Sequence, residues 1–338
     1  MALLKPTHFK HEVPVLFHEP HVEGGFRPLH QPWGYYLASL FQRHNECLNT
    51  WTHLIALVMT LQRLYEFSQE FDLLYDPYMW PLLAGMITMI LLYIGSSGAH
   101  CFQSRSELVH YTCFMVDYAG IGLYGLGSTI LHYAYCSDPW LFSFMKHLYL
   151  PVAIFLSILV CVCCSISKTM YQRPYPFTRK VWQLASVILV YTWLILPVVH
   201  RLLICLETSQ WDNSISHHLQ QMVWFITSGF FFGSDIPQRF YPGKFDFLGH
   251  SHQLFHFCVM MTSYKQLDSV LLDIKQFENQ IRARPMPSFF STTGAVVFVS
   301  FANTLVVMAF REYVKRSHVS SSKKQNGCQN GIKHDKNS

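Results

Sequence analysis

Long stretches without charged residues recur along the chain and are separated by short polar segments. Each approaches the about 20 residues that a helix needs to cross the hydrocarbon core of a bilayer. Eight stretches predict eight helices, at residues 47–62, 80–99, 118–136, 148–167, 181–199, 213–234, 247–264 and 285–310. The first is short, but Arg63 beyond it can extend its charged end to the interface. The pattern predicts an all-α, polytopic membrane protein with a seven-helix core and an eighth, C-terminal transmembrane helix.

Composition agrees with a membrane environment. Only 13% of the residues are charged and 51% are hydrophobic, whereas about a quarter of the residues of a soluble domain are charged. The net charge of +5 lies mainly in the expected inner loops and the tail. We therefore expect contact with anionic lipid headgroups and no binding to nucleic acid.

The orientation follows from positive charge, because Lys and Arg accumulate on the cytoplasmic side of membrane proteins. The first 45 residues contain no compact apolar segment of the kind found in cleavable signal peptides. With the N-terminus inside, the inner segments hold 18 lysines and arginines and the outer segments hold 6. Both termini are therefore predicted to be cytoplasmic.

Four regions follow from this topology. We expect a cytoplasmic N-terminal arm (1–45), a seven-helix core (46–270), an outer loop with the eighth helix (271–310) and a basic cytoplasmic tail (311–338). The arm holds many prolines and is expected to be irregular. The tail is rich in Lys, Ser, Asn and Gly and is expected to be disordered.

The ten cysteines show no paired framework. Cys161, Cys163 and Cys164 fall within an apolar stretch and are interpreted as small core residues, with palmitoylation as the lesser alternative. Cys136 and Cys205 would both lie near the outer face and could pair, but the sequence contains no distance between them.

A metal site is suggested by His252-x-x-x-His256. This spacing places two imidazoles one helical turn apart on one face, as two helix-borne ligands of a tetrahedral metal require. His250 lies roughly 200° around the helix from His252, so it is the poorer ligand candidate. Histidine pairs also occur as ordinary polar residues at helix ends, so a third ligand is needed.

The predicted topology brings further polar residues to the same membrane face. His100 ends the second stretch, with Ser96 one turn before it, and Asp117 begins the third stretch in an apolar setting. A bare carboxylate there would be costly, so Asp117 needs a partner or a function. His100 is either a third metal ligand or an interfacial polar residue, as lone histidines at helix ends often are.

Glu46, Asn49 and His53 share one helical face at the start of the first stretch, through their i, i+3, i+7 spacing. They are either ordinary capping polars or a hydrogen-bonded cluster that supports the site. The fourth and fifth stretches carry no charge and read as scaffold or lipid-facing spans. The connection between them, from Lys168 to Lys180, reads as a loop anchored at the headgroups.

Three ordered motifs resemble the signature motifs of the progestin and adipoQ receptor family. They are Glu46-x-x-Asn49-x-x-x-His53, then Ser96-x-x-x-His100 followed by Asp117, and then Pro242-Gly243-Lys244-Phe245-Asp246 leading into His252-x-x-x-His256. The resemblance extends from about residue 27 to residue 265. The eighth apolar stretch and the segments around Arg27 and Arg43 look like the membrane progestin receptor branch.

The resemblance implies zinc held by His100, His252 and His256, with Asp117 and Ser96 near the metal and a lipid-accessible cavity. It also implies a receptor at the plasma membrane that binds a progestin and signals without the nucleus, with heterotrimeric G proteins as candidate partners. The sequence does not single out the steroid contacts.

A second function is an alternative. The family's adiponectin receptors and the alkaline ceramidases they resemble suggest zinc-dependent hydrolysis of a lipid amide, with Asp117 carrying protons and Ser96 donating a hydrogen bond. A zinc ion that only joins helices is a third interpretation.

Overall fold

The computed structural model describes residues 4–171 and 175–334, and beyond residue 317 it describes the backbone alone. Within these residues the regular structure is helical, and an isolated β-bridge joins His8 and Phe26 in the N-terminal arm. The all-α prediction is therefore confirmed.

Eight long helices in the described residues overlap the eight predicted stretches. They are α2 (Cys47–Glu70), α3 (Trp80–Phe102), α4 (Glu107–Leu131), α6 (Tyr149–Thr169), α7 (Phe177–Thr208), α8 (Asn213–Ser234), α9 (Ser251–Gln276) and α11 (Thr293–His334). Short elements connect them or form the arm: η1 (Lys10–Glu12), η2 (Val15–Phe17), α1 (Trp33–Ala38), η3 (Ser39–Phe41), η4 (Pro77–Met79), η5 (Gln103–Arg105), the π-helical turn η6 (His132–Cys136), α5 (Pro139–Met145) and α10 (Glu278–Arg282).

Five of these helical segments are long and apolar enough to cross a membrane. They are Pro77–Arg105, Glu107–Cys136, Tyr149–Thr169, Phe177–Thr208 and Thr293–Ser317. Helices α2, α8 and α9 are more polar, and they bury polar residues such as Asn49, His53, His218, Gln266 and Asp273 inside the bundle. Seven crossings in the core and an eighth after it therefore remain a prediction.

Local signals explain where several helices begin. Asp212 caps α8 by accepting hydrogen bonds from the backbone N–H groups of Ser214 and Ile215, both at 3.0 Å. The Ser106 side chain caps α4 by accepting from the N–H of Val109 at 3.3 Å. These side chains satisfy donors that have no partner within the first turn of a helix.

The Ser106 cap corrects one expectation. The charge-free stretch begins after Asp117, so we expected the helix to begin near that residue at the cytoplasmic end. Helix α4 instead begins at Glu107, ten residues earlier, and Asp117 lies within the helix and is only 8% exposed. A helix is delimited by its caps, and these can lie outside its apolar stretch.

Two further boundaries differ from the prediction. Helix α7 is longer than the 181–199 stretch at both ends. The tail was expected to be disordered, but α11 continues to His334, and an i, i+4 ion pair between Glu312 and Arg316 at 3.1 Å supports its first turns beyond the apolar stretch. Residues 335–338 lie outside the described part.

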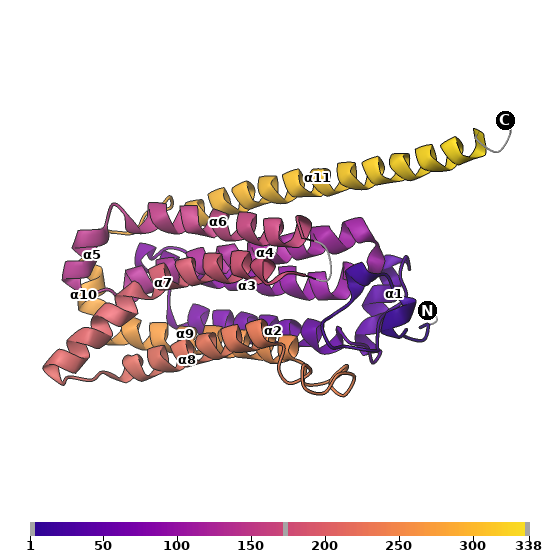
Figure 1. The fold of residues 1–338 in the computed structure, drawn as a ribbon. Helices are drawn as coiled ribbons and strands as arrows, with labels where there is room; N and C mark the ends of the chain where they lie inside the picture. The colour runs from indigo at the N-terminus through magenta and orange to yellow at the C-terminus, as the bar shows by residue number, and fades with distance from the viewer. Residues whose placement is uncertain (1–3, 172–174, 335–338) are drawn as a thin grey trace.

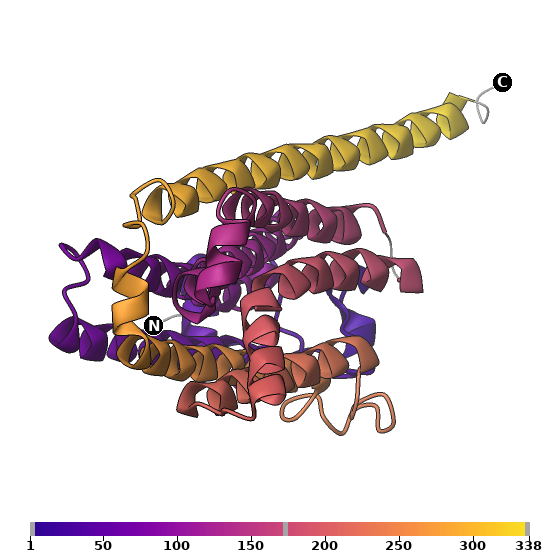
Figure 2. The same cartoon turned by 90° about the vertical axis from the view of Figure 1, so that its left-hand side faces the viewer.

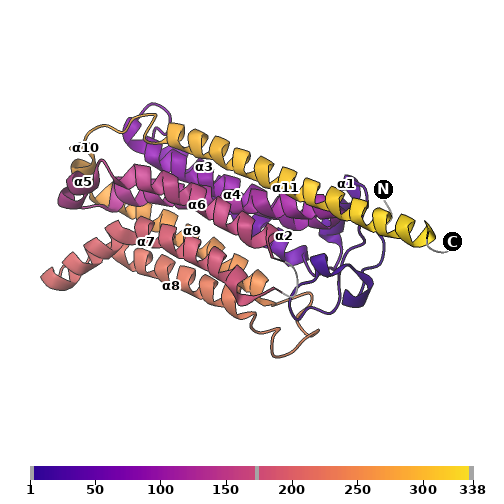
Figure 3. The same cartoon turned by 45° about the horizontal axis from the view of Figure 1, so that its top comes forward.

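Figures 1 and 2 show the helices lying side by side in a bundle, with α11 along its outside. Side chains of α11, including Val296 and Val299, pack in a buried cluster with Leu126 of α4 and Ala153 of α6. The N-terminal arm and the C-terminal end of α11 lie at one end of the bundle, and α5 and α10 lie at the other (Figures 1 and 3).

Candidate functional site

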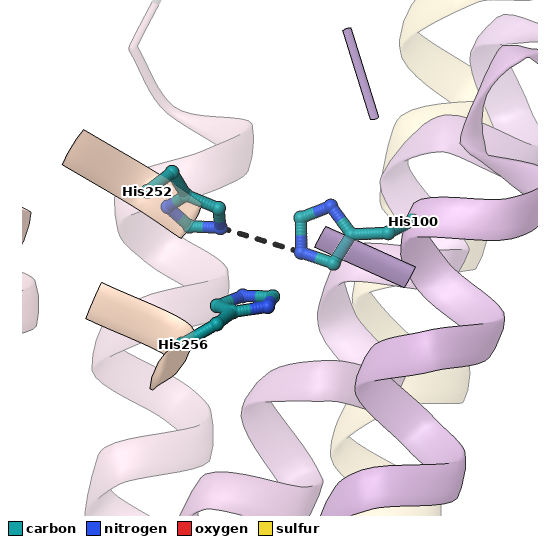
Figure 4. A group of neighbouring side chains, drawn as sticks. All are labelled: His100, His252 and His256. Atoms are coloured by element: carbon teal, nitrogen blue, oxygen red, sulfur yellow. Dashed lines mark hydrogen bonds between the residues drawn. The ribbon is translucent and has the colours of Figure 1, made fainter. Parts of the chain in front are cut away.

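Three histidines from two helices that are far apart in the sequence face one another (Figure 4). His100 comes from the last turns of α3, and His252 and His256 come from the first turns of α9. One nitrogen atom from each of the three rings lies within 4.8 Å of the other two. The Nε2 atoms of His100 and His252 are 3.3 Å apart. This places the three residues singled out by the sequence in one cluster.

The outward-facing nitrogens of two of these rings have hydrogen-bond partners. His100 Nδ1 lies 2.7 Å from a carboxylate oxygen of Glu46, and His256 Nδ1 lies 3.0 Å from the backbone carbonyl oxygen of Asn49. Each partner selects the tautomer that leaves Nε2 free for a metal, as outer partners of histidine ligands do. The cluster therefore fits zinc, which binds imidazole nitrogen and leaves a fourth position open at catalytic sites.

Glu46 is held by further contacts at the start of α2. Its Oε2 accepts a hydrogen bond from the Asn49 side-chain amide at 2.7 Å, and its Oε1 accepts from Gln103 at 3.3 Å. Gln103 in turn lies 2.6 Å from the ring of His110. Of these residues, Gln103 and His110 had no motif that would have selected them from the sequence.

His53 lies directly beside the cluster. Its ring stacks on that of His256, with centroids 3.9 Å apart and planes at 15°. It is 3% exposed, and neither of its ring nitrogens has a hydrogen-bond partner among the described residues. Buried polar groups are usually satisfied, so this ring is a place where a bound water or ligand would be stabilised.

The N-terminal arm braces the same end of α3. The buried Arg27 guanidinium donates hydrogen bonds to the backbone carbonyls of His100 and Cys101, both at 2.7 Å. These carbonyls lie in the last turn of the helix, where intrahelical partners are lacking and a cation is favoured. The arm therefore fixes the backbone that carries His100.

Two other histidines at this end have different roles. Burial lowers the pKa of His44 to about 2, so its ring is neutral, and its Nδ1 accepts a hydrogen bond from the N–H of Glu46 at 3.1 Å. His250 is the N-cap residue of α9 and lies 3.1 Å from the carbonyl oxygen of Asn45. Its position outside the histidine cluster agrees with its poor placement in the sequence.

A cavity of about 220 Å³ adjoins the three histidines. Ser96, Asp117 and His53 line it beside the cluster, and aromatic residues of α8 and α9, including Phe225, Phe232 and Phe255, form part of its apolar wall. A mostly apolar cavity with a few polar side chains is typical of sites that bind small lipophilic molecules.

The cavity corrects the prediction for the fourth and fifth stretches. Cys164 and Lys168 of α6 and Gln183 and Val187 of α7 line it, so these helices are more than scaffold or lipid-facing spans. Lys168 does not lie in a headgroup loop, because it belongs to α6, is 3% exposed and has its Nζ 3.8 Å from the centroid of the Phe114 ring. Arg173, in the same connection, lies outside the described residues.

The cysteines are free thiols in the part of the chain that the structure describes. Cys161, Cys163 and Cys164 are buried, as predicted for core residues. Cys136 and Cys205 are not bonded to each other, and the Cys136 sulfur instead accepts a hydrogen bond from Arg201 at 3.7 Å.

Residues 41–267 match the family model described as Haemolysin-III related. The chain is 36% identical over 306 residues to membrane progestin receptor beta of Sus scrofa, which covers 90% of this chain and 86% of that protein. It is 38% identical over 263 residues to membrane progestin receptor beta of Mus musculus, with coverage of 78% and 74%. It is also 37% identical over 262 residues to membrane progestin receptor alpha of Homo sapiens, with coverage of 78% and 75%. The chain therefore belongs to the haemolysin-III related family of polytopic membrane proteins, the progestin and adipoQ receptors, and to its membrane progestin receptor branch.

Proposed function

We propose that this chain is a membrane receptor that binds a progestin in the cavity beside its histidine cluster. The observation that carries the proposal is the similarity, over most of the chain, to proteins named membrane progestin receptors. The cavity supports it, because a steroid is largely apolar and needs few hydrogen-bond partners. Its volume of about 220 Å³ is below the usual range of ligand pockets, about 300 to 1,000 Å³, so we expect lining side chains to move on binding.

Steroid binding can be tested with a variant that fills the cavity. Val187 of α7 lines the cavity, whereas Leu189 of the same helix is 52% exposed on the outer surface of the bundle. Val187→Trp should weaken saturable binding of labelled progesterone to membranes by roughly tenfold or more, equivalent to at least about 1.4 kcal/mol. Leu189→Trp should leave binding unchanged. Absence of saturable binding in folded wild-type protein at the cell surface would contradict the proposal.

The second part of the proposal is a zinc ion held by His100, His252 and His256. When bound, zinc would supply a Lewis acid that polarises a carbonyl group and makes a water molecule more acidic. The convergence of one nitrogen from each ring supports this ligand set, as do the partners of His100 and His256. Metal analysis of purified protein should find less zinc in the His100→Ala variant than in the wild type.

A second candidate function is hydrolysis of a lipid amide such as ceramide. It is favoured by Asp117 and Ser96, which line the same cavity as the histidines. Asp117 would carry a proton between water and the leaving amine, and Ser96 would donate a hydrogen bond to the developing oxyanion. The apolar walls would hold the acyl chain.

Hydrolysis predicts that purified protein releases sphingosine from ceramide. Chelation of the metal, His256→Ala or Asp117→Asn should abolish release, and Leu189→Trp should not. Product release that persists in these variants would remove the assignment. Bound metal with neither steroid binding nor turnover would leave zinc with a structural role, joining α3 to α9.

We further propose that the chain resides in the plasma membrane with both termini in the cytoplasm, and that it signals through heterotrimeric G proteins. The excess of Lys and Arg in the predicted inner segments supports this orientation. Epitope tags at either terminus of surface-expressed protein should be detected by antibody only after permeabilisation. Progesterone should increase nucleotide exchange on a G protein only in membranes that contain the chain.

A further inference from the structure

A second group of possible metal ligands lies at the opposite end of the bundle from the three histidines. Cys136 ends the π-helical turn η6, His218 lies near the start of α8, and Asp273 lies near the end of α9. The Cys136 sulfur, a His218 ring nitrogen and an Asp273 carboxylate oxygen all lie within 4.8 Å of one another. None of the three side chains is more than 2% exposed.

The carboxylate of Asp273 is oriented by neighbours on one side. Its Oδ1 accepts hydrogen bonds from Arg201 at 2.6 Å and from the Ser214 hydroxyl at 2.5 Å. Its Oδ2 lies 2.8 Å from His218 Nε2. One oxygen therefore accepts hydrogen bonds from its supports while the other faces His218, as in ligands held by an outer shell of hydrogen bonds.

The His218 ring is held in the same way. Its Nδ1 lies 2.7 Å from the side-chain amide of Gln221. An amide can present either its nitrogen or its oxygen to a neighbour, so Gln221 can accept the Nδ1–H that remains when Nε2 binds a metal. In that orientation the neighbouring ring of His132 keeps a hydrogen-bond donor, because the side-chain amide nitrogen of Gln266 lies 3.1 Å from His132 Nε2.

The charges of the cluster also suit a divalent cation. Arg201 forms an ion pair with Asp212 at 2.7 Å as well as with Asp273, so Asp212 balances the guanidinium. The Asp273 carboxylate and a Cys136 thiolate then balance a dication. A cysteine sulfur, a histidine nitrogen and a carboxylate oxygen are all ligands that zinc accepts.

We propose that Cys136, His218 and Asp273 form a second zinc site, separate from the three histidines, that joins the end of α4 to α8 and α9. On binding, the Cys136 thiol releases its proton to solvent and its sulfur bonds to the metal. The second site does not depend on the proposed receptor or hydrolase function.

Cobalt provides a selective test, because a cobalt–thiolate bond gives a near-ultraviolet charge-transfer band and an all-histidine site lacks that ligand. Full-length protein with His100→Ala and His256→Ala, purified in detergent and loaded with Co²⁺, should show this band with one cobalt per chain. Adding Zn²⁺ should remove it. A further Cys136→Ser substitution should abolish the band, whereas Cys161→Ser, at another buried free thiol, should keep it.

The proposal is overturned if the folded double variant, judged by cooperative thermal unfolding, binds neither cobalt nor zinc. It is also overturned if the band survives Cys136→Ser. Should the Cys136→Ser protein fail to fold, X-ray absorption of the zinc-loaded double variant decides, because Cys136 ligation requires a Zn–S distance of about 2.3 Å. A spectrum with nitrogen and oxygen neighbours alone would contradict the site.

Discussion

Glu46 contacts a ring of the histidine cluster from the side away from the expected metal position. Its carboxylate accepts from the Nδ1–H of His100 at 2.7 Å, in surroundings that leave Glu46 only 2% exposed. A buried carboxylate beside a histidine ligand fixes the ring and makes the opposite nitrogen a stronger donor to a metal.

Glu46→Gln should therefore lower zinc affinity by about 10- to 100-fold. Competition with a chelator of known affinity measures the change, in the Cys136→Ser background so that only the histidine cluster is observed. Glu70→Gln at the other end of α2 is the matched control, because Glu70 is exposed and pairs with Lys275 on the surface. Equal zinc affinity of the Cys136→Ser protein with and without Glu46→Gln would show that Glu46 does not support the metal site.

At the scale of the elements, α4 approaches its neighbours through glycines. A side chain at Gly122 would overlap the backbone carbonyl oxygen of Ser157 in α6, and the Ser157 hydroxyl donates to the Gly122 carbonyl at 2.6 Å. A side chain at Gly120 would come within 3.0 Å of the backbone of Leu92 in α3. Small residues allow such close approach of helices in membranes. The contacts hold α4 close to α3 and α6, and both of these helices contribute lining residues to the cavity.

Gly122→Ala should therefore destabilise the bundle by about 1 to 3 kcal/mol, the usual range for overpacking. Gly98→Ala is the matched control on α3, since among the described residues no atom beyond its chain neighbours and the nearby backbone of its own helix lies within 4 Å of the added methyl group. It should stabilise the bundle by about 0.5 to 1 kcal/mol. Thermal unfolding in detergent, followed by tryptophan fluorescence, measures both. A Gly122→Ala protein as stable as the Gly98→Ala protein would refute the close contact.

At the scale of the whole molecule, the histidine cluster joins segments that are far apart in the sequence. His100 and His256 are separated by more than 150 residues, yet their ring centroids are 4.8 Å apart. A metal bound there would stabilise the packing of α3 against α9, because it binds the folded bundle and not the separated helices.

Removal of the metal should consequently lower the unfolding temperature. At a free zinc concentration 1,000-fold above the dissociation constant, the lost stabilisation is about 4 kcal/mol. Thermal unfolding of the Cys136→Ser protein with and without a chelator measures it. In that background, the same chelator should have no effect on protein that also carries His100→Ala and His256→Ala. Identical unfolding of the first protein with and without chelator would contradict a zinc ion at the histidines.

The sequence by itself was enough to predict the approximate positions of the long helices and the ligand candidates. Uncharged stretches near membrane-spanning length predicted the positions of the eight long helices, because helices inside a bilayer must satisfy their backbone groups internally and exclude charge. The i, i+4 spacing of His252 and His256 is a property of any helix, and the alternation of helices across a membrane brings His100 to the same end. The motifs were sufficient to identify the family.

Tertiary structure alone decided which side chains share the interior. The brace from Arg27, the cavity lining from Lys168 and Gln183, and the cluster of Cys136, His218 and Asp273 join residues that no local pattern relates. The apolar pattern also did not predict where the helices begin and end, because capping residues such as Ser106 determine these positions. The physical reason is that hydrophobic patterning specifies which segments are buried, whereas the rotation of each helix and its close contacts decide which polar groups meet.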